Sequence, residues 1–322
     1  MTILLLETLH PEAQDRLASA GRVILAEDPE EAIAVAQRES VVAIMTRGRG
    51  QVRRPLIEAS PRLRLIARPG IGLDNVDVAA ATERGVMVMN APGSTTIAVA
   101  EQTLLLMSAL VRGLYPSAHA VKSGNWEIRR QYAGDDLAGK RLGLVGMGQI
   151  ARRVAHLASA YDMEVVYWSR VKKEVPFSYV PLTELLAGSD IVSLHLALTP
   201  ETRHIIGRDE LAQMKPGAFL INTARGAVVD QAAVLEALDN GRLAGFASDV
   251  LDPEPPAPDD PILAHERTLI TPHTGALTSA TYRAMCLRTV DNVLAALRGD
   301  PVEPGCIANE KELGLSRKAV EL

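Results

Sequence analysis

The segment Leu142-Gly143-Leu144-Val145-Gly146-Met147-Gly148-Gln149-Ile150-Ala151 joins a short apolar run, a glycine-containing turn and the start of a helical pattern. That order predicts a buried β-strand that turns directly into a helix. The first turn glycine permits a tight turn, and the second lets backbone N–H groups at the helix N-terminus approach a pyrophosphate. Ala151 replaces a third glycine and is small enough for close strand–helix packing. We therefore expect a dinucleotide to bind at Gly146, Met147, Gly148, Gln149 and Ile150; the alternative is an ordinary turn without a ligand.

Apolar runs of strand length alternate with helix-length segments on both sides of this motif. The predicted strands are 3–6, 41–45, 63–67, 86–89, 142–145, 164–168, 191–194, 218–222 and 245–248. The predicted helices are 11–20, 29–38, 52–59, 75–84 (capped by Asp74 or Asn75), 95–123, 149–160, 231–239 and 279–298, with a turn-rich stretch at 124–139. This βαβ alternation predicts an α/β fold whose sheet is mostly parallel and covered on both faces.

Composition excludes several classes of protein. The 322 residues carry a net charge of −5 and only two Trp, six Tyr and three Phe, which argues against a nucleic-acid surface. Cys286 and Cys306 are too few for a disulfide framework, and the histidines lack metal-ligand spacing, so we expect no metal. The richest apolar stretch, 95–111, is interrupted by Glu101 and Gln102, and no targeting segment is visible. We expect a cytoplasmic protein that binds neither nucleic acid nor membrane.

Four segments together resemble the D-isomer-specific 2-hydroxyacid dehydrogenases, closest to their phosphoglycerate dehydrogenase and glyoxylate/hydroxypyruvate reductase branch. They are Arg68–Asp77 (RPGIGLDNVD), Gly146–Ala151, Asn222–Asp230 (NTARGAVVD), and Asp249–Glu254 (DVLDPE) leading to Thr271–Gly275 (TPHTG). The resemblance implies two Rossmann-like domains with parallel sheets. It assigns residues 1–94 and 286–322 to a discontinuous substrate domain, and 95–285 to the dinucleotide-binding domain.

The same segments contain the groups that interconversion of a D-2-hydroxy acid and its 2-oxoacid requires. Arg225 offers a bidentate guanidinium for the carboxylate, and His273 is an acid–base group that titrates near neutral pH. Glu254 precedes His273 by 19 residues and can hydrogen-bond the imidazole, favouring its protonated form. The family uses matching positions in these roles. Taken singly, each has an ordinary alternative: a surface ion pair for Arg225, a loop position for His273 and an exposed acid for Glu254.

The cofactor preference depends on the end of strand 164–168. An NAD site normally has Asp or Glu there, about 20 residues after the glycines, but this chain has Ser169 followed by Arg170. Lys172 and Lys173 add positive charge, so we expect NADP to be preferred and NAD to be the alternative; Arg170 stacking on adenine would instead allow both. The resemblance adds further cofactor-binding positions, namely Thr96, His195, Thr202, Thr223, Ala224, Asp249 and Gly275.

The resemblance places the substrate against Arg47, Arg68, Gly70, Ile71 and Gly72. The backbone of 70–72 is expected to hold the substrate carboxylate together with Arg225, and the two added arginines favour an acid with a second anionic group. The alternative is that Arg47, Arg49, Arg53 and Arg54 form one solvated basic face. Candidate substrates are glyoxylate, hydroxypyruvate and 3-phosphohydroxypyruvate.

The apolar segment 96–111 matches a helix that builds a two-fold dimer in the family, and Trp126 lies in an expected arm toward the partner. We therefore expect a homodimer; the alternative is a helix buried within one chain. The activity that follows is that of an NAD(P)-dependent D-2-hydroxyacid dehydrogenase. A dinucleotide-sensing, corepressor-like binding protein is the competing class, and turnover of 2-oxoacids distinguishes the two.

Overall fold

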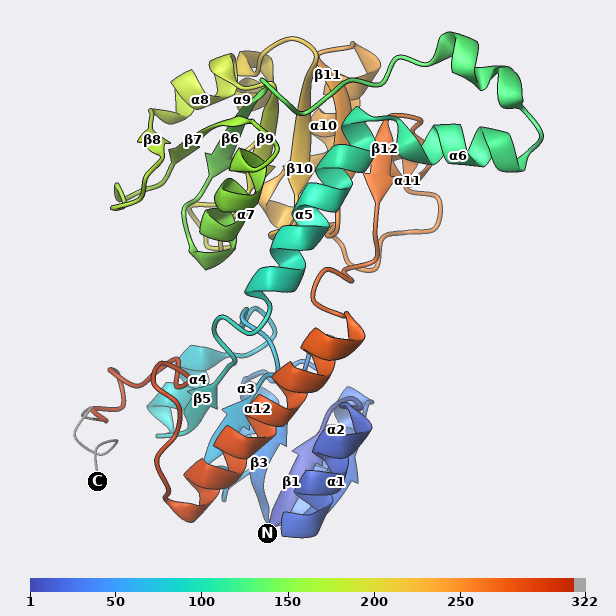
Figure 1. Ribbon diagram of the computed structural model, residues 1–322. Helices are drawn as coiled ribbons and strands as arrows, with labels where there is room; N and C mark the ends of the chain where they lie inside the picture. The colour runs from blue at the N-terminus through green and yellow to red at the C-terminus, as the bar shows by residue number, and fades with distance from the viewer. Residues whose placement is uncertain (316–322) are drawn as a thin grey trace. The chain divides into compact units, whose positions relative to one another are not determined.

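The computed structural model describes residues 1–315 as two units, each built on a parallel sheet (Figure 1). Unit 1 contains Met1–Thr95 and the chain from Leu277 onward, and unit 2 contains Thr96–Ala276. The second crossing between units therefore lies at 276/277, whereas the sequence predicted 285/286. The reason is that α12 (Ser279–Arg298) is one uninterrupted helix whose buried face packs in unit 1. Residues 316–322 of the expected substrate domain lie outside the described residues.

Unit 1 has a five-stranded parallel sheet in the order β2-β1-β3-β4-β5. Apolar side chains on its strands alternate between two faces, as parallel strands buried on both faces require. Ile3 and Leu5 pack toward α1 and α12, whereas Leu4 and Ile44 pack toward α2, α3 and α4. In chain order the elements are β1 (Thr2–Leu5), α1 (Pro11–Ala20), β2 (Arg22–Leu25), α2 (Pro29–Arg38), β3 (Val41–Met45), α3 (Arg54–Glu58), β4 (Leu65–Ala67), α4 (Val78–Glu83), β5 (Met87–Met89) and α12.

Unit 2 has a seven-stranded parallel sheet in the order β12-β11-β10-β9-β6-β7-β8. Helices α5 and α7 pack on one face, and α8, α9 and α10 pack on the other. The elements are α5 (Thr96–Val111), α6 (Leu114–Lys122), η1 (Trp126–Gln131), β6 (Arg141–Val145), α7 (Gln149–Ser159), β7 (Glu164–Trp168), β8 (Ser178–Tyr179), α8 (Leu182–Gly188), β9 (Ile191–Leu194), α9 (Arg208–Gln213), β10 (Ala218–Asn222), η2 (Gly226–Val228), α10 (Gln231–Asp239), β11 (Leu243–Ser248), α11 (Pro261–Ala264) and β12 (Thr268–Ile270).

The strand order of unit 2 reverses between β6 and β9. From β6 the chain runs outward through β7 and β8, then returns to the other side of β6 and continues through β9, β10, β11 and β12. In open parallel sheets, ligands bind outside the carboxyl ends of the strands at such a switch point. This topology confirms the α/β prediction. It also indicates that a ligand binds at the carboxyl edge of the unit 2 sheet.

The single helix predicted over 95–123 is wrong: two helices, α5 and α6, meet at a bend of 66°. Gly113 is the cause, because its φ of +56° lies in the left-handed region that stops a right-handed helix. Pro116 then fits the first turn of α6, where no backbone donor is needed. Among the described residues, no single helix is long and apolar enough to span a membrane; α5 and α6 meet that criterion only as a bent pair.

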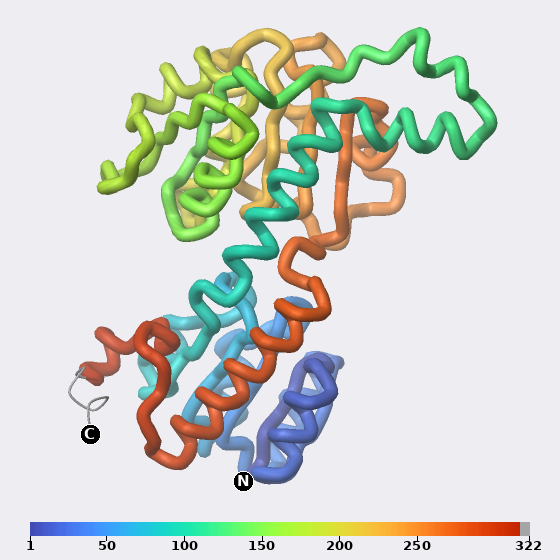
Figure 2. Tube along the Cα trace, viewed as in Figure 1, coloured from blue at the N-terminus to red at the C-terminus, as the bar shows by residue number. Residues whose placement is uncertain are grey.

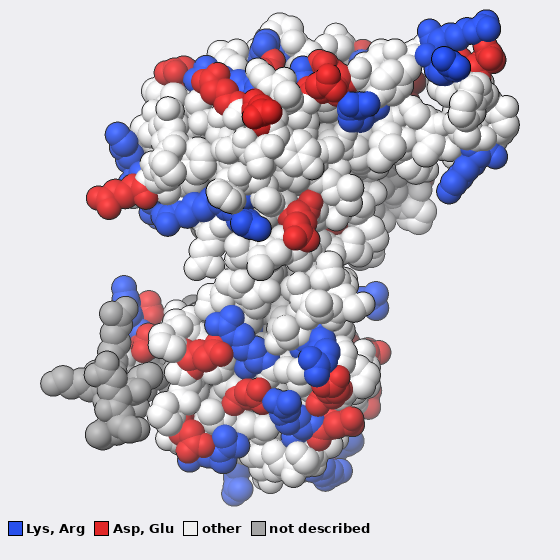
Figure 3. All heavy atoms as spheres, in the orientation of Figure 1, with Lys and Arg blue, Asp and Glu red and all other residues white. Residues whose placement is uncertain are grey.

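An arm formed by α6 and η1 extends from unit 2 and returns to β6 (Figures 1 and 2). None of its helical residues is buried, and Trp126 is 65% exposed. On the face drawn in Figure 3, lysine and arginine are interspersed with aspartate and glutamate over both units. Contact with a partner surface would explain why the arm exposes apolar side chains.

Candidate active site

The carboxyl edge of the unit 2 sheet collects the predicted catalytic segments. Strands β10, β11 and β12 end in register, with Asn222 beside Ser248 and Ser248 beside Ile270. Arg225 follows β10 by three residues, Glu254 lies in the loop after β11, and His273 follows β12. The glycine turn after β6 lies at the same edge, at the switch point.

The turn between β6 and α7 has the properties that a pyrophosphate needs. Gly146 has a φ of +105°, and a Cβ there would lie 2.3 Å from the carbonyl oxygen of His195. A Cβ on Gly148 would instead meet no atom within 4 Å, so this position is open. Within the described residues, no acceptor is found for the N–H groups of Gly148, Gln149 and Ile150 at the start of α7. These residues fit a nicotinamide dinucleotide, with its phosphates on the helix N-terminus.

The end of β7 lacks the carboxylate that would bind ribose hydroxyls. Ser169 is buried and its hydroxyl donates to the carbonyl of Val171 at 2.8 Å, which closes a short turn. Arg170, Lys172 and Lys173 around that turn are exposed. The turn therefore presents positive charge next to a hydroxyl.

Apart from Thr96, the other predicted cofactor positions lie in loops at this edge, and several of them hold the loops together. The Thr202 hydroxyl donates to the carbonyl of Ala197 at 2.7 Å, and the Thr223 hydroxyl lies 2.8 Å from that of Thr103 on α5. The imidazole Nε2 of His195 lies 2.9 Å from the Ser193 hydroxyl, and burial lowers the pKa of His195 to about 4. His195 is therefore neutral at physiological pH. Thr96 begins α5, and Ala224 and Gly275 lie in the loops after β10 and β12.

The turn that carries Arg225 requires glycine at the following position, 226. The Asn222 side chain closes the turn, donating to the Arg225 carbonyl at 2.8 Å and accepting from the Ala224 N–H at 3.0 Å. A Cβ on Gly226 would lie 2.0 Å from the carbonyl carbon of Leu251, so a side chain cannot be accommodated without displacing backbone. The motif Asn222–Gly226 is thus a rigid support for the arginine.

Asp249 organises the loop that carries His273. Its carboxylate accepts from the Thr271 hydroxyl at 2.5 Å, the Thr274 N–H at 3.0 Å and the Gly275 N–H at 2.8 Å. Its carbonyl accepts from the His273 N–H at 2.8 Å. These bonds hold His273 at a φ of +54°, a left-handed conformation that non-glycine residues seldom adopt outside constrained sites.

Glu254 and His273 meet as the sequence predicted. Glu254 Oε1 lies 2.7 Å from His273 Nδ1, and both side chains are about 40% exposed (43% and 39%). Sequence reasoning missed Gln231 at the start of α10, whose side chain donates to the Asp252 carbonyl at 3.0 Å and accepts from its N–H at 2.7 Å. This paired bond fixes the loop that carries Glu254. Bonds from a side chain to loop backbone leave no periodic pattern in the sequence, which is why Gln231 was missed.

The predicted substrate-contacting turn of unit 1 follows β4 and has its carbonyl groups fully engaged. The carbonyl of Gly70 accepts from the Ala91 N–H at 2.8 Å, that of Ile71 from the Asn90 side chain at 2.7 Å, and that of Gly72 from Arg68 at 2.6 Å. In the described chain no acceptor is found for the N–H groups of 70–72. The turn therefore presents amide donors, and Asn90 is a supporting residue that the sequence did not indicate.

The arginines between the end of β3 and the first residue of α3 differ in their surroundings. Arg47 Nε lies 3.5 Å from Glu7 Oε2, and Arg54 pairs with Glu83 at 2.8 Å. Arg49 and Arg53 are exposed. They are not one uniform solvated face, because Arg47 is directed to a buried carboxylate.

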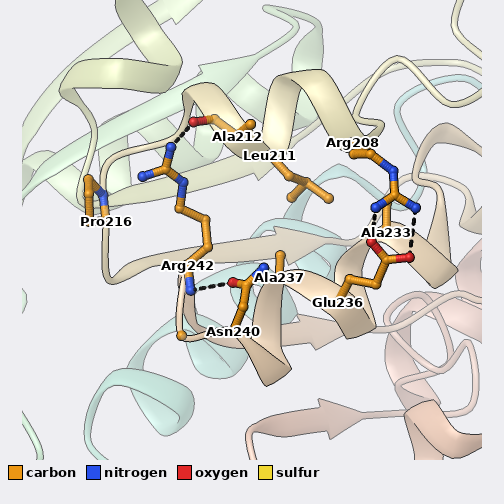
Figure 4. Close-up of a pocket in the computed structure, with 10 residues that line it drawn as sticks. Arg208, Leu211, Ala212, Pro216, Ala233, Glu236, Ala237, Asn240 and Arg242 are labelled. Carbon is orange, nitrogen blue, oxygen red and sulfur yellow. Dashed lines mark hydrogen bonds and ion pairs between the residues drawn. The ribbon is translucent and has the colours of Figure 1, made fainter.

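A hollow within unit 2 lies away from these residues (Figure 4). It has a volume of about 390 Å³ between α9 and α10, where Arg208 pairs with Glu236 and Arg242 donates to the carbonyl of Ala212. Pro216 and Arg242 in its lining precede β10 and β11, so the hollow is at the amino edge of the sheet. We place the active site at the opposite, carboxyl edge. Among the described residues, no group of three or more His, Cys, Asp or Glu side chains is arranged to hold a metal ion.

Residues 104–275 match the model of the D-isomer specific 2-hydroxyacid dehydrogenase family's NAD binding domain. The chain belongs to this family. The family is that of NAD(P)-dependent oxidoreductases acting on 2-hydroxy acids, which confirms the family, the enzyme class and the nicotinamide cofactor predicted from sequence.

Relatives of this dehydrogenase are named glyoxylate reductase, hydroxypyruvate reductase or D-3-phosphoglycerate dehydrogenase. It is 39% identical over 263 residues to the glyoxylate reductase of Korarchaeum cryptofilum, covering 79% of each chain. It is 36% identical over 307 residues to the D-3-phosphoglycerate dehydrogenase of Methanocaldococcus jannaschii, covering 94% of this chain. It spans only 58% of that second relative's length.

Solved structures agree with the fold. A Thermus thermophilus protein matches with a TM-score of 0.89 and 39% identity over 95% of this chain and 99% of that one. The NADPH-dependent glyoxylate/hydroxypyruvate reductase of Sinorhizobium meliloti, solved with NADP and malonate, matches with a TM-score of 0.85 and 30% identity over 92% and 93%. The prediction of two Rossmann-like domains is confirmed at the level of the fold.

Proposed function

We propose that this dehydrogenase reduces a small 2-oxoacid to its D-2-hydroxy acid, with NADPH as the preferred cofactor. The observation that carries the proposal is the 2.7 Å contact between Glu254 and His273 at the edge of the sheet where the Arg225 turn and the Gly146 turn also lie. A carboxylate-binding cation, an acid–base pair and a dinucleotide-binding turn are the set that this reaction requires.

Each residue of the set has a distinct role in the proposal. Arg225 binds the substrate carboxylate and polarises the neighbouring carbonyl. His273 donates a proton from Nε2 to the carbonyl oxygen, and Glu254 on Nδ1 orients the ring and stabilises the imidazolium. When bound, the nicotinamide ring supplies the hydride. In the oxidation direction His273 takes the hydroxyl proton.

NADPH preference is supported by what stands at the end of β7. Ser169 leaves no carboxylate to repel a 2′-phosphate, and the exposed Arg170, Lys172 and Lys173 supply cations for it. The NADP-bound reductase of Sinorhizobium meliloti is a structural neighbour with the same stated preference. We expect NAD to bind more weakly than NADP.

In unit 1, the proposed substrate contacts are the amides of Gly70, Ile71 and Gly72 together with Arg68. The amides are oriented because all three carbonyl groups of this turn are engaged inside the protein. Glyoxylate, hydroxypyruvate and 3-phosphohydroxypyruvate are the candidate acids, since relatives include a glyoxylate reductase, a hydroxypyruvate reductase and a D-3-phosphoglycerate dehydrogenase.

A substrate panel tests the proposal. Oxidation of NADPH and NADH is followed at 340 nm with each of the three acids, and cofactor binding is measured separately by fluorescence. We expect turnover of at least one acid and faster turnover with NADPH. Tight cofactor binding without turnover of any 2-oxoacid would instead support a dinucleotide-sensing protein.

We further propose that the enzyme is a cytoplasmic homodimer assembled through α5 and the arm. Ile97 and Leu105 on α5 are 61% and 58% exposed, and the arm adds Tyr115 and Trp126 to this apolar surface. A partner covering these side chains would remove them from water. Light scattering at micromolar concentration is expected to give twice 34.6 kDa; a mass of 34.6 kDa contradicts the dimer.

A further inference from the structure

The carboxylate of Glu7, two residues after β1, lies inside a turn of backbone amides formed by residues 46–50. Glu7 is only 5% exposed. Its Oε1 atom accepts from four successive backbone N–H groups and from the Thr46 hydroxyl at 3.2 Å. The four N–H distances are 2.8 Å for Arg47, 2.6 Å for Gly48, 3.0 Å for Arg49 and 3.3 Å for Gly50. Successive N–H groups that converge on one point form an anion-binding concavity.

The turn is built to keep this shape. A Cβ on Gly50 would lie 2.4 Å from the Cβ of Leu6, so the close approach to β1 requires glycine. The Asn75 side chain donates to the Gly50 carbonyl at 2.7 Å and to the Thr46 hydroxyl at 3.2 Å. Because Asn75 holds both the Gly50 carbonyl and the Thr46 hydroxyl, the two ends of the turn are fixed around Glu7.

Glu7 is a full negative charge in this turn. Burial opposes its ionisation, but the backbone hydrogen bonds from Gly48, Arg47 and Gly50 outweigh burial and lower the pKa of Glu7. Its other oxygen, Oε2, lies 3.5 Å from Arg47 Nε, and the Arg47 guanidinium lies 5.3 Å from the centre of the Tyr282 ring. The charge of Arg47 is therefore balanced by a resident anion.

The occupied turn lies beside the substrate contacts proposed in unit 1. Strands β3 and β4 pair in parallel with Met45 opposite Ala67, so Thr46 and Arg68 leave neighbouring strands at the same carboxyl edge. The Thr46 N–H donates to the Ala67 carbonyl at 3.1 Å. A group at the distal end of a substrate held by Arg68 and the turn at 70–72 would approach residues 46–50.

We propose that Glu7 is a specificity-determining residue that restricts the distal end of the substrate to uncharged groups. Its carboxylate fills the anion-binding turn and neutralises Arg47, so a second anion finds there neither free amide donors nor an unbalanced positive charge. The inference rests on the proposed function and narrows its substrate class. Glyoxylate and hydroxypyruvate are then substrates, whereas a 2-oxoacid with a distal phosphate is not. This replaces the expectation of a dianionic substrate based on counting arginines.

The test compares kcat/KM for hydroxypyruvate with that for 3-phosphohydroxypyruvate at saturating NADPH. Wild-type enzyme is expected to favour hydroxypyruvate by about tenfold or more. Glu7→Gln keeps an acceptor for the amides but removes the charge, and should move the ratio about tenfold toward the phosphorylated acid. The added change Arg47→Gln should abolish that gain, because the released guanidinium is what binds the phosphate. Higher salt should shrink the difference.

Glu39→Gln is the matched control. Glu39 pairs with Arg22 at 2.9 Å just before β3, at the opposite edge of the same sheet, so its loss should leave the ratio unchanged. Wild-type enzyme that uses the phosphorylated acid as well as hydroxypyruvate overturns the inference without any variant. A folded Glu7→Gln enzyme with an unchanged ratio overturns it as well.

Failure of the proposed function is distinguishable from failure of this inference. If wild-type enzyme turns over no 2-oxoacid, calorimetry with inorganic phosphate replaces kinetics. Glu7→Gln should then bind phosphate at least tenfold more tightly than wild-type protein. Equal phosphate affinities would contradict the role of Glu7.

Discussion

Glu254 Oε1 lies 2.7 Å from Nδ1 of His273, and in the proposed function the other ring nitrogen, Nε2, donates the proton. His273→Ala should lower kcat roughly 10²- to 10⁴-fold in both directions, the range of a general acid–base group. Glu254→Gln should lose less, because the amide still orients the ring but carries no charge to stabilise the imidazolium that donates the proton. Steady-state kinetics check both variants. A Glu254→Gln enzyme with wild-type kcat contradicts the assigned role.

Arg225 is expected to act through the shape of its guanidinium as well as its charge. Arg225→Lys keeps the charge but cannot form two parallel hydrogen bonds to a carboxylate. A charge-assisted hydrogen bond contributes about 1.5–3 kcal/mol, so kcat/KM should fall about tenfold or more for every 2-oxoacid. The affinity for NADPH, measured by fluorescence titration, should be unchanged. An equal loss of cofactor affinity would show that Arg225 supports the fold instead.

Alanine substitution at two glycines of this edge should have different effects: one should lower stability, and the other should weaken cofactor binding. Gly226→Ala forces a Cβ onto the backbone of Leu251 and should destabilise the protein by about 2 kcal/mol or more. Gly148→Ala meets open space and should leave stability near wild type, but it narrows the site for the pyrophosphate and should weaken NADPH binding. Urea unfolding and fluorescence titration separate the two effects. A stable Gly226→Ala protein would mean that the Arg225 turn relaxes easily.

The partly buried imidazole of His195 gives unfolding a pH dependence. Burial lowers the folded-state pKa to about 4, whereas the unfolded chain binds the proton near the usual value of about 6.5. The unfolded state therefore takes up more protons as pH falls from about 6.5 toward 4, and stability falls with it. Between pH 7 and pH 5 the contribution is about 2 kcal/mol. His195→Gln should remove that part of the pH dependence in urea unfolding; an unchanged dependence contradicts it.

The cofactor preference should be reversible at two positions. Ser169→Asp with Arg170→Pro restores an acceptor for the ribose hydroxyls and a charge that repels a 2′-phosphate. Wild-type enzyme should favour NADPH by about tenfold or more, since one or two charge-assisted contacts are involved. The double variant should favour NADH. Wild-type kcat/KM for NADH equal to that for NADPH would contradict the assignment.

The sequence predicted those parts of the fold that depend on local pattern. The turn after β6 is readable because glycine spacing, strand and helix adjoin one another, and β3, β7, β9, β10 and α12 have the predicted bounds. The edge strand β2 was missed, because its half-exposed residues give no buried run. The break at Gly113 was also missed, since 95–123 is continuously apolar enough to resemble one helix.

Long-range polar contacts were the least predictable part of the site. The family resemblance suggested that Glu254 hydrogen-bonds His273, and the structure places the two side chains 2.7 Å apart. Glu7, however, reaches a turn about 40 residues further along the chain and binds backbone amides, which have no sequence signature. Gln231 and Asn90 likewise act on backbone groups. A count of arginines in the sequence does not reveal that Arg47 lies 3.5 Å from the Glu7 carboxylate.

The most direct test of the central claim is the product formed from hydroxypyruvate and NADPH. Wild-type enzyme and His273→Ala are incubated for the time in which the wild-type reaction reaches completion, and the glycerate is resolved by chiral chromatography. One D-glycerate is expected per NADPH oxidised with wild-type enzyme, and almost none with the variant. Formation of L-glycerate, or equal D-glycerate formation by both proteins, would contradict it.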